Sequence, residues 1–391
     1  MYVTRPRSLY RKFPGALSVR PQPDDLYSGH LVVSDEESEA MDSCCFGIWR
    51  NDRISRLPFP SDKILEVVHS SIHEEASTTK VWFLPVLDQS LSSNRYYVIK
   101  AKGRHKGQAY TCRREGDTGS CCFKTSKRDP KIRPFDYRDR YQQFEIHRHH
   151  SGGFFAKSIE WDGYPPNFLK RGGWEVYATP FKIHLNEAPG LRFSSTFECP
   201  VPNLPLHAKR STPVVLGKWY SPFIFIKEGD CRIHDQMRKS SYYELSLKQW
   251  WEQIYYTENV INHNNVVFVD ARVKRLLCLV FGMEGERDGG EDGEGFVWFK
   301  VKEGLRKRGS VGLSSVFWEK MKWLQRTRGW FDGEREVRLS GEKEIESESG
   351  SVWRKFGCYV LVESFVVRRM DGSLVINFNF RNTDKIECRW E

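Results

Sequence analysis

The chain has 391 residues, a formal net charge of +10, and 39% hydrophobic and 14% aromatic residues. Its aromatic content excludes a disordered chain, and its length predicts about two domains whose cores need no disulfide or metal support. The apolar runs are far shorter than the ~20 residues that cross a bilayer, so we expect no transmembrane segment. Prolines interrupt the basic first residues and no apolar stretch follows them, which argues against a secretory signal.

Runs of β-branched and aromatic residues predict strands in both halves of the chain. The predicted strands are residues 30–34, 80–86, 96–100, 154–159, 266–273, 296–301, 358–368 and 374–380. Between the last two, Asp371 and Gly372 predict a β-hairpin with a type I′ turn, in which both central residues take positive φ.

Two segments have the apolar spacing of a helix. The first stripe consists of Leu247, Trp250, Trp251, Ile254 and Tyr255. These positions recur every three or four residues, which predicts one apolar helix face, and Ser246 and Gln249 before and within it have the spacing of a capping box. A second helix is predicted at residues 315–326, with Gly329 placed to end it.

Composition changes along the chain predict its organisation. A proline-rich stretch divides the chain into a β-rich N-terminal domain at 1–199, a linker at 200–213 and a C-terminal domain at 214–391. The glycine-rich acidic run at 282–295 predicts an exposed loop that lacks the ligands of a calcium site. The predicted fold class is α+β: antiparallel β-rich in the N-terminal region, and antiparallel strands with two or more packed helices in the C-terminal region.

Positive charge is concentrated in residues 100–150, which hold 14 Lys and Arg against 6 Asp and Glu. Within this segment, Arg104, His105 and Lys106 are bracketed by glycines and follow a predicted strand. Backbone amides and cations in such a turn converge on anions, so these three residues are the predicted anion-binding site. The motif is not a Walker A loop. The alternative is a glycine-bearing hairpin with solvated charges.

Cysteine and histidine side chains also gather in this segment. They are Cys112, Cys121, Cys122, His147, His149 and His150. Zinc prefers thiolate and imidazole ligands, but the spacing contains no C-x-x-C pair, and whether these residues lie near one another is open at this stage. We therefore predict no metal and no cofactor, and we expect most of the ten cysteines to be reduced thiols inside the fold.

Long motifs are spread along the whole chain. They include MYVTRPRSLYRK at 1–12, LSSNRYYVI at 91–99, GKWYSPFIFIKEGD at 217–230 and FGCYVLVESFVVRRMDGSLV at 356–375. In these segments the chain resembles a plant-specific family known as domain of unknown function 1262, over nearly its whole length. The resemblance implies a soluble protein of land plants. It implies no activity and assigns no catalytic or binding residues.

The common catalytic signatures are absent from the sequence, including G-x-S-x-G, H-E-x-x-H and G-x-G-x-x-G. We therefore predict a non-enzymatic binding or regulatory protein of the cytoplasm and/or nucleus, linked to stress or defence. The first alternative is a protein that binds RNA or a phosphate ligand through residues 100–150, since an acidic partner or nucleic acid suits that charge. The second alternative is an enzyme of unrecognised type.

Overall fold

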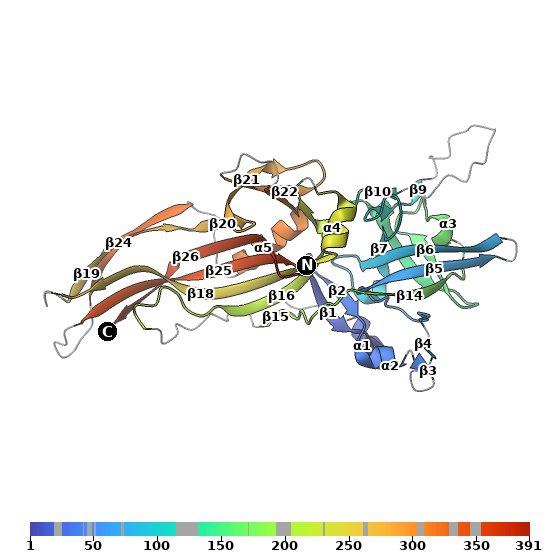
Figure 1. Cartoon of the computed structure of the whole chain (residues 1–391), viewed down its shortest axis with the longest axis horizontal. Coiled ribbons are helices and arrows are strands. Elements are labelled where there is room, and N and C mark those ends of the chain that lie inside the picture. The colour runs from blue at the N-terminus through green and yellow to red at the C-terminus, as the bar shows by residue number, and fades with distance from the viewer. Residues whose placement is uncertain are drawn as a thin grey trace.

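Two large sheets lie end to end along an elongated molecule (Figure 1). The computed structural model describes residues 1–18, 26–41, 43–44, 49–50, 52–71, 74–114, 132–170, 172–192, 205–229, 231–260, 265–302, 309–327, 335–344 and 353–391. Strands make up most of these residues, and among their helices only one exceeds seven residues. The α+β prediction is therefore wrong: sheet packing, rather than helices packed on sheets, builds the molecule.

The larger sheet is organised around three long, adjacent antiparallel strands. They are β18 (Tyr242–Glu258), β25 (Lys355–Arg369) and β26 (Leu374–Trp390). Beyond β26 follow β20 (Leu276–Val280), β21 (Met283–Glu291), β22 (Phe296–Val301), β23 (Ser310–Ser314) and β17 (Ile226–Glu228). Beyond β18 follow β16 (Val214–Pro222), β1 (Tyr2–Pro6) and β2 (Gly29–Val33), with β15 (Gly190–Leu191) also on β16. At ~3.3 Å per residue the longest strands span about 56 Å, which explains the elongated shape.

The smaller sheet forms the other end of the molecule. Its strands, in spatial order, are β10 (Ile132–Arg133), β8 (Ala109–Tyr110), β7 (Arg95–Lys100), β6 (Glu74–Pro85), β5 (Lys63–Ser71) and β14 (Glu175–Lys182). A branch on β7 consists of β11 (Gln143–Arg148) and β12 (Phe154–Ser158). Separate two-stranded ribbons pair β9 (Arg113–Arg114) with β13 (Gly163–Tyr164), β19 (Val266–Lys274) with β24 (Glu336–Glu344), and β3 (Ser43–Cys44) with β4 (Trp49–Arg50).

Helices play a small part in the described residues. They are α1 (Arg7–Lys12), α2 (Glu36–Met41), α3 (Asn167–Lys170), α4 (Ile233–Lys239) and α5 (Ser315–Thr327), with 3₁₀ turns at Pro14–Ser18, Leu91–Ser93, Arg140–Gln142 and Phe223–Phe225. The helix predicted at 315–326 is confirmed as α5, which buries Phe317, Met321 and Leu324. Gly329 lies outside the described residues. None of these helices is long and apolar enough to cross a membrane.

The helix predicted around 247–255 is wrong, because these residues belong to strand β18. Pairing with β25 continues along the whole of β18, with one irregularity near its C-terminal end. Trp250 and Trp251 point to opposite faces of the strand, yet both are buried because both faces are covered there. A strand buried on both sides has no alternation of polar and apolar residues, so its apolar positions matched a helical period by coincidence.

The strands predicted from local composition are confirmed, and so is the hairpin at Asp371 and Gly372, which joins β25 to β26. The predicted turn type is wrong. Only Gly372 has positive φ, at 84°. Its N–H donates to the Arg369 carbonyl, and the Arg369 N–H donates to the Ser373 carbonyl. This pattern is a three-residue loop that closes with a left-handed glycine, in which Asp371 keeps negative φ.

The acidic run at 282–295 is not an open loop as predicted. It forms β21 and the turn into β22. Lys302 of the chain after β22 donates to Glu284 at 2.7 Å, and Lys300 of β22 donates to Asp288 at 3.1 Å. Cross-strand lysines therefore offset the like charges that made this run resemble a solvated loop.

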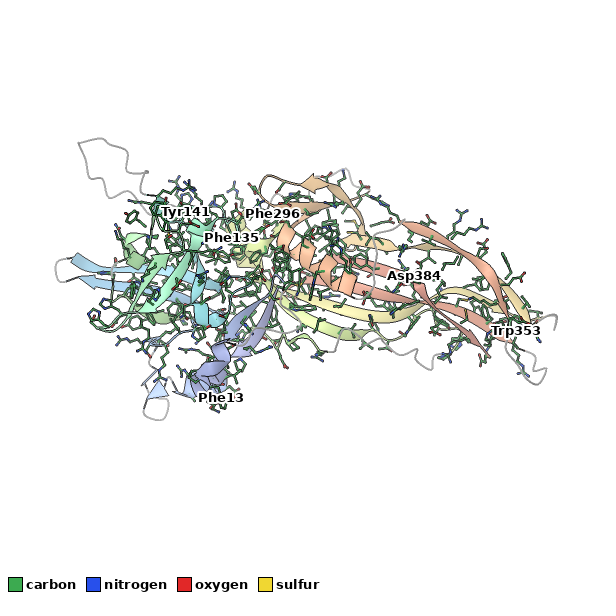
Figure 2. All side chains as sticks on the ribbon, turned by 180° about the vertical axis from the view of Figure 1, so that it is seen from behind. Phe13, Phe135, Tyr141, Phe296, Trp353 and Asp384 are labelled. Atoms are coloured by element: carbon green, nitrogen blue, oxygen red, sulfur yellow. The ribbon has the colours of Figure 1, made fainter. Side chains whose placement is uncertain are left out.

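An aromatic cluster joins the two large sheets. Trp82 of β6 stacks on Phe223 with ring centroids 5.9 Å apart and meets Tyr242 of β18 edge-to-face at 4.9 Å. The Trp82 indole and the Tyr242 hydroxyl both donate to the Ser61 carbonyl, at 2.7 and 2.6 Å. Phe135, which lies in the same part of the molecule (Figure 2), packs edge-to-face on Phe225. A continuous core therefore runs from one sheet into the other, while the chain division at 200–213 stays a prediction.

Removing the Trp82 side chain tests this junction. We expect Trp82→Ala to lower the free energy of unfolding by about 3–5 kcal/mol, because a fully buried indole and its hydrogen bond are lost. Denaturant unfolding followed by circular dichroism measures the change. Trp161 is 90% exposed and supplies the matched control. The unfolding free energy of Trp161→Ala is expected to stay within about 0.5 kcal/mol of the parent. Equal losses of stability in the two variants would contradict the role of Trp82 in the junction.

The buried carboxyl of Asp62 predicts a specific pH dependence of stability. Asp62 accepts hydrogen bonds from the Ser34 N–H and hydroxyl, but burial raises its pKa to about 6 from the ordinary 3.8. Between pH ~4 and ~6 the folded chain keeps a proton that the unfolded chain releases, so this group's contribution to stability falls as pH rises through that window.

The isosteric Asp62→Asn variant isolates this contribution. The parent is expected to lose about 2 kcal/mol relative to the variant between pH 4 and pH 7, because one pKa unit corresponds to about 1.4 kcal/mol and the unfolded carboxyl is already partly ionised at pH 4. Unfolding free energies of both proteins, measured across this range, give the difference. Parallel pH profiles for the two proteins would show that Asp62 does not titrate as described.

Candidate functional site

The predicted anion-binding residues lie in the turn between β7 and β8. Arg104 and His105 are exposed and Lys106 is half-buried. The amides of Lys106 and Gly107 are used within the turn, since they donate to the Gly103 and Lys100 carbonyls. The His105 ring contacts the Gln108 side chain at 3.1 Å. The turn is thus a closed hairpin connection, and anion binding there stays a prediction.

The histidines at 147–150 lie at the other end of strand β7. β11 runs antiparallel to β7, and the Ile146 N–H donates to the carbonyl of Asn94, just before β7 begins. The turn at 103–107 follows the opposite end of β7. The two groups are therefore separated by at least the ~17 Å length of a six-residue strand, and they do not converge on one cavity.

The structure supplies no metal site from the cysteines and histidines that it describes. Among the described residues no group of three His, Cys, Asp or Glu side chains could hold an ion. Cys112 is buried in the smaller core, and burial raises its pKa to about 12. His149 instead contacts Ser151 at 2.7 Å and packs on His150. Cys121 and Cys122 lie outside the described residues.

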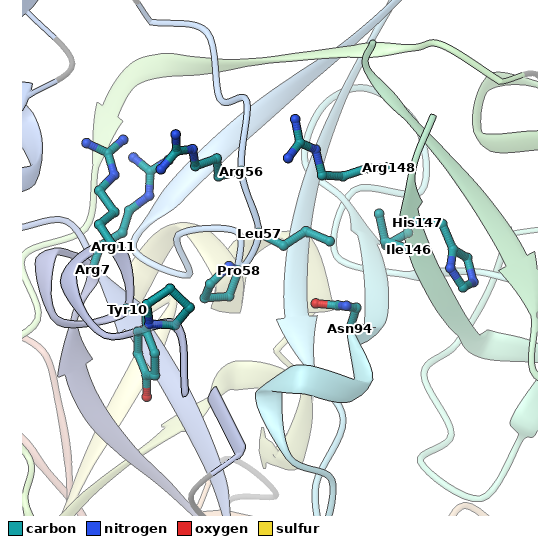
Figure 3. A pocket seen from close by; sticks show the side chains of 11 residues that line it. Arg7, Tyr10, Arg11, Arg56, Leu57, Pro58, Asn94, Ile146, His147 and Arg148 are labelled. Carbon is teal, nitrogen blue, oxygen red and sulfur yellow. The ribbon is translucent and has the colours of Figure 1, made fainter. Parts of the chain in front are cut away.

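A cavity of about 360 Å³ opens where α1 meets the smaller sheet. Four arginines from three separate parts of the chain line it: Arg7 and Arg11 of α1, Arg56 of the segment before β5, and Arg148 at the end of β11. Figure 3 shows their guanidinium groups along one side of the cavity. The remaining wall consists of Tyr10, Pro14, Leu57, Pro58, Asn94, Ile146 and His147. We call this cavity the arginine pocket.

Helix α1 presents its arginines to the pocket because of their spacing. Arg7, Tyr10 and Arg11 are three and four residues apart, so one helix face carries all three side chains. Strand β1 fixes the position of this helix, since it pairs with β2 on one side and β16 on the other. The Arg11 guanidinium donates to the Ser38 carbonyl of α2 at 3.2 Å, which orients its head group.

The opposite wall is fixed by strand β11. The hydrogen bond from the Ile146 N–H to the Asn94 carbonyl holds two lining residues together at 2.9 Å. His147 stacks on Phe155 with ring centroids 5.1 Å apart, and its Nε2 lies 3.0 Å from a Glu145 carboxylate oxygen. Phe155 and Glu145 therefore hold the His147 ring in place, while the Arg148 side chain is exposed at the rim of the pocket.

The charges around the pocket have one sign. None of the described residues that line it carries a carboxylate. Neither Arg56 nor Arg148 forms an ion pair with any residue that the structure describes. Four guanidinium groups around one cavity repel one another, and an anion between them relieves that repulsion. Guanidinium groups also match the planar edges of phosphate and carboxylate groups with paired hydrogen bonds. The pocket is suited to holding an anion.

Sequence reasoning missed the arginine pocket. The Arg7, Tyr10 and Arg11 spacing was visible as one face of a short basic helix. Arg56 gave no local signal, because it lies in a segment without periodicity. Arg148 was counted in the basic segment, but its role depends on where β11 ends.

The comparisons with known proteins find a family similarity for part of the chain. The family model described as "Protein of unknown function (DUF1262)" matches residues 24–123, about a quarter of the chain. The resemblance to this family is confirmed for those residues, which include Arg56 and Asn94 of the pocket. No curated protein matches the chain. A solved structure titled "Crystal structure of Cry35Ab1" is similar with a TM-score of 0.48 and 10% identity, covering 85% of this chain and 90% of that chain.

The burial of Cys112 predicts that its thiol is unreactive in the folded protein. With its pKa near 12, only about 10⁻⁴ of this thiol is ionised at pH 8. We expect iodoacetamide to alkylate the exposed Cys231 while sparing Cys112, as measured by peptide mass mapping. In denaturant both are expected to react. Equal labelling of both thiols in the native protein would contradict the burial of Cys112.

Proposed function

We propose that the protein binds a small phosphate-bearing ligand in the arginine pocket. The observation that supports this function is the convergence of four guanidinium groups on a cavity whose described lining contains no carboxylate. A cavity of about 360 Å³ is within the range that small ligands occupy in proteins. The apolar wall formed by Leu57, Pro58 and Ile146 would contact the uncharged part of such a ligand.

Binding of a phosphate ligand is one of the alternatives that the sequence predicts, and we now propose the arginine pocket as its site. Binding of RNA or a phosphate ligand was assigned to residues 100–150, and two pocket residues, His147 and Arg148, belong to that segment. Arg7, Arg11 and Arg56 come from outside it. A cavity of about 360 Å³ favours a small ligand over a polymer, because single-stranded nucleic acid needs an extended groove with aromatic stacking platforms.

Binding without catalysis is the broader proposal. The described pocket lining contains no nucleophilic serine, threonine or cysteine, which supports a binding or regulatory protein rather than an enzyme of unrecognised type. We also propose that the family relationship extends beyond residues 24–123 to the other matching motifs and to a plant origin. A role in stress or defence in the cytoplasm and/or nucleus is part of this proposal.

Charge reversal in the pocket tests the proposal. Arg56→Glu and Arg148→Glu are suited to this, because both side chains are exposed and their loss leaves no described ion pair broken. Pyrophosphate is the probe, and isothermal titration calorimetry at physiological salt gives the dissociation constant. Each substitution is expected to weaken binding by about 10-fold or more, since a charge-assisted hydrogen bond contributes about 1.5–3 kcal/mol.

Arg104→Glu and Lys106→Glu provide a control with the same change in net charge. These substitutions in the β7–β8 turn are expected to leave pyrophosphate affinity within about twofold of the parent at physiological salt, where distant charges are screened. The opposite pattern, with loss only in the turn variants, would move the anion site to Arg104 and Lys106. A third outcome is that single-stranded RNA binds more tightly than pyrophosphate and that both sets of variants lose this binding. The ligand would then be a nucleic acid rather than a small molecule.

A further inference from the structure

Two cysteines face each other near the far end of the long sheet, away from the arginine pocket. Cys358 of β25 and Cys388 of β26 are direct cross-strand partners. Their sulfur atoms lie 3.2 Å apart, and both are free thiols. Both cysteines belong to one apolar cluster with Trp353, which Figure 2 labels. Nothing in the proposed ligand binding uses these thiols.

The hydrogen-bond pattern of the two strands places the cysteines at a position where a disulfide can form. Lys355 and Glu391 exchange both backbone hydrogen bonds, at 3.0 and 2.9 Å. Pairs alternate along antiparallel strands and the register from there to the cysteines is unbroken, so Cys358 and Cys388 form a non-hydrogen-bonded pair. In such pairs the Cα atoms are about 4.5 Å apart, which lies inside the range that disulfides span.

The surroundings give the two thiols different properties. Cys358 is 1% exposed, whereas Cys388 is half-buried. The two sulfur atoms share one hydrogen bond in which either can donate. With Cys358 as the donor this bond, helped by Lys343, lowers the pKa of Cys388 to about 7 despite burial and the opposing charge of Glu387. The same hydrogen bond and burial raise the pKa of Cys358. Cys388 is therefore the more accessible and the more readily ionised sulfur.

We propose that Cys358 and Cys388 are an oxidation site, at which a hydroperoxide converts the two thiols into a reversible cross-strand disulfide. The Cys388 thiolate attacks the terminal oxygen of the hydroperoxide, the O–O bond breaks, and the leaving alkoxide takes up a proton to become an alcohol. Cys388 is then a sulfenic acid. The Cys358 sulfur attacks the Cys388 sulfur, and the hydroxyl leaves with the Cys358 proton as water.

This reaction is balanced and needs only small movements. The two thiols lose two electrons in total, and the hydroperoxide gains them as it becomes an alcohol and water. The sulfur atoms must approach from 3.2 Å to the ~2.05 Å of a disulfide, which side-chain rotation can provide because the backbone is already at bonding separation. The bond closes a loop of about 30 residues that contains the β25–β26 hairpin, and thiol reductants reopen it.

Peptide mapping of the full chain tests the proposal directly. The reduced protein is treated with tert-butyl hydroperoxide at pH 7, remaining thiols are blocked with iodoacetamide, and the protein is digested without reduction. The expected product is a linked pair of peptides containing Cys358 and Cys388, lighter by about 2 Da than the two thiol peptides and separated again by dithiothreitol. A disulfide from Cys388 to any other cysteine, or no linkage while Cys388 becomes sulfinic acid, would overturn it.

Cys278 of β20 provides an internal control in the same experiment. It is a single buried thiol of the same sheet, and burial raises its pKa to about 12. Cys388 is expected to oxidise on the order of 10²–10³ times faster, because its larger thiolate fraction outweighs the lower nucleophilicity of a thiolate of lower pKa. Equal rates for the two thiols would show that the pairing with Cys358 gives no activation, which contradicts the proposal.

Two variants separate the roles of the cysteines. In Cys358→Ala the Cys388 sulfenic acid is expected to form more slowly, because the hydrogen bond that favours the thiolate is lost, but to persist and be trapped by dimedone. The parent is expected to give little adduct, because Cys358 resolves it. In Cys388→Ala, Cys358 is expected to stay reduced at the same hydroperoxide dose. Rapid oxidation of Cys358 without Cys388 would overturn the assignment of the attacking sulfur. If either variant fails to fold, the peptide mapping of the parent chain still tests the proposal.

Discussion

The packing of Trp82 against Phe223 and Tyr242 is the interaction on which the rest of the structure depends. It brings strand β6 of the smaller sheet onto the larger sheet, and the shared Ser61 carbonyl fixes how the two surfaces meet. Each sheet has an apolar face that must be covered, and each covers part of the other. Helix α1 is held by the larger sheet through β1, and β11 belongs to the smaller sheet. The contact between the two sheets is therefore what places α1 beside β11.

Arg369 and the arginine pocket show two different environments for arginine side chains. Near the junction, Arg369 forms a paired contact with the Glu228 carboxylate at 2.6 and 2.8 Å, and Tyr243 donates to the same carboxylate. Burial opposes ionisation of Glu228, but these hydrogen bonds outweigh it and lower its pKa. The arginine pocket contains no such carboxylate in its described lining. An arginine paired with a buried carboxylate stabilises the fold, whereas four arginines around a cavity whose described lining has no carboxylate are suited to an anionic ligand.

The arginine pocket and the thiol pair use different parts of the architecture. The pocket is made where segments from distant parts of the chain meet, so its geometry depends on the junction between the sheets. The thiol pair depends only on the register of two neighbouring strands, and β25 carries Cys358 near one end and Arg369 at the other. One long strand thus carries a residue of the proposed oxidation site and also contributes to the core at the junction.

The sequence alone determined eight of the strands, because β-branched and aromatic runs bounded by turn residues report local preference directly. Strands such as β5, β14 and β16 were not predicted. It also determined α5, where one apolar stripe continues for three turns, and the hairpin after Arg369. It could not determine the state of 247–258, since a strand covered on both faces loses the alternation that distinguishes it from a helix. Tertiary structure also decided the site: Arg7, Arg56 and Arg148 are far apart in sequence, and Cys358 and Cys388 are 30 positions apart. Their proximity follows from strand register and sheet packing, which depend on contacts between distant residues that no local pattern encodes.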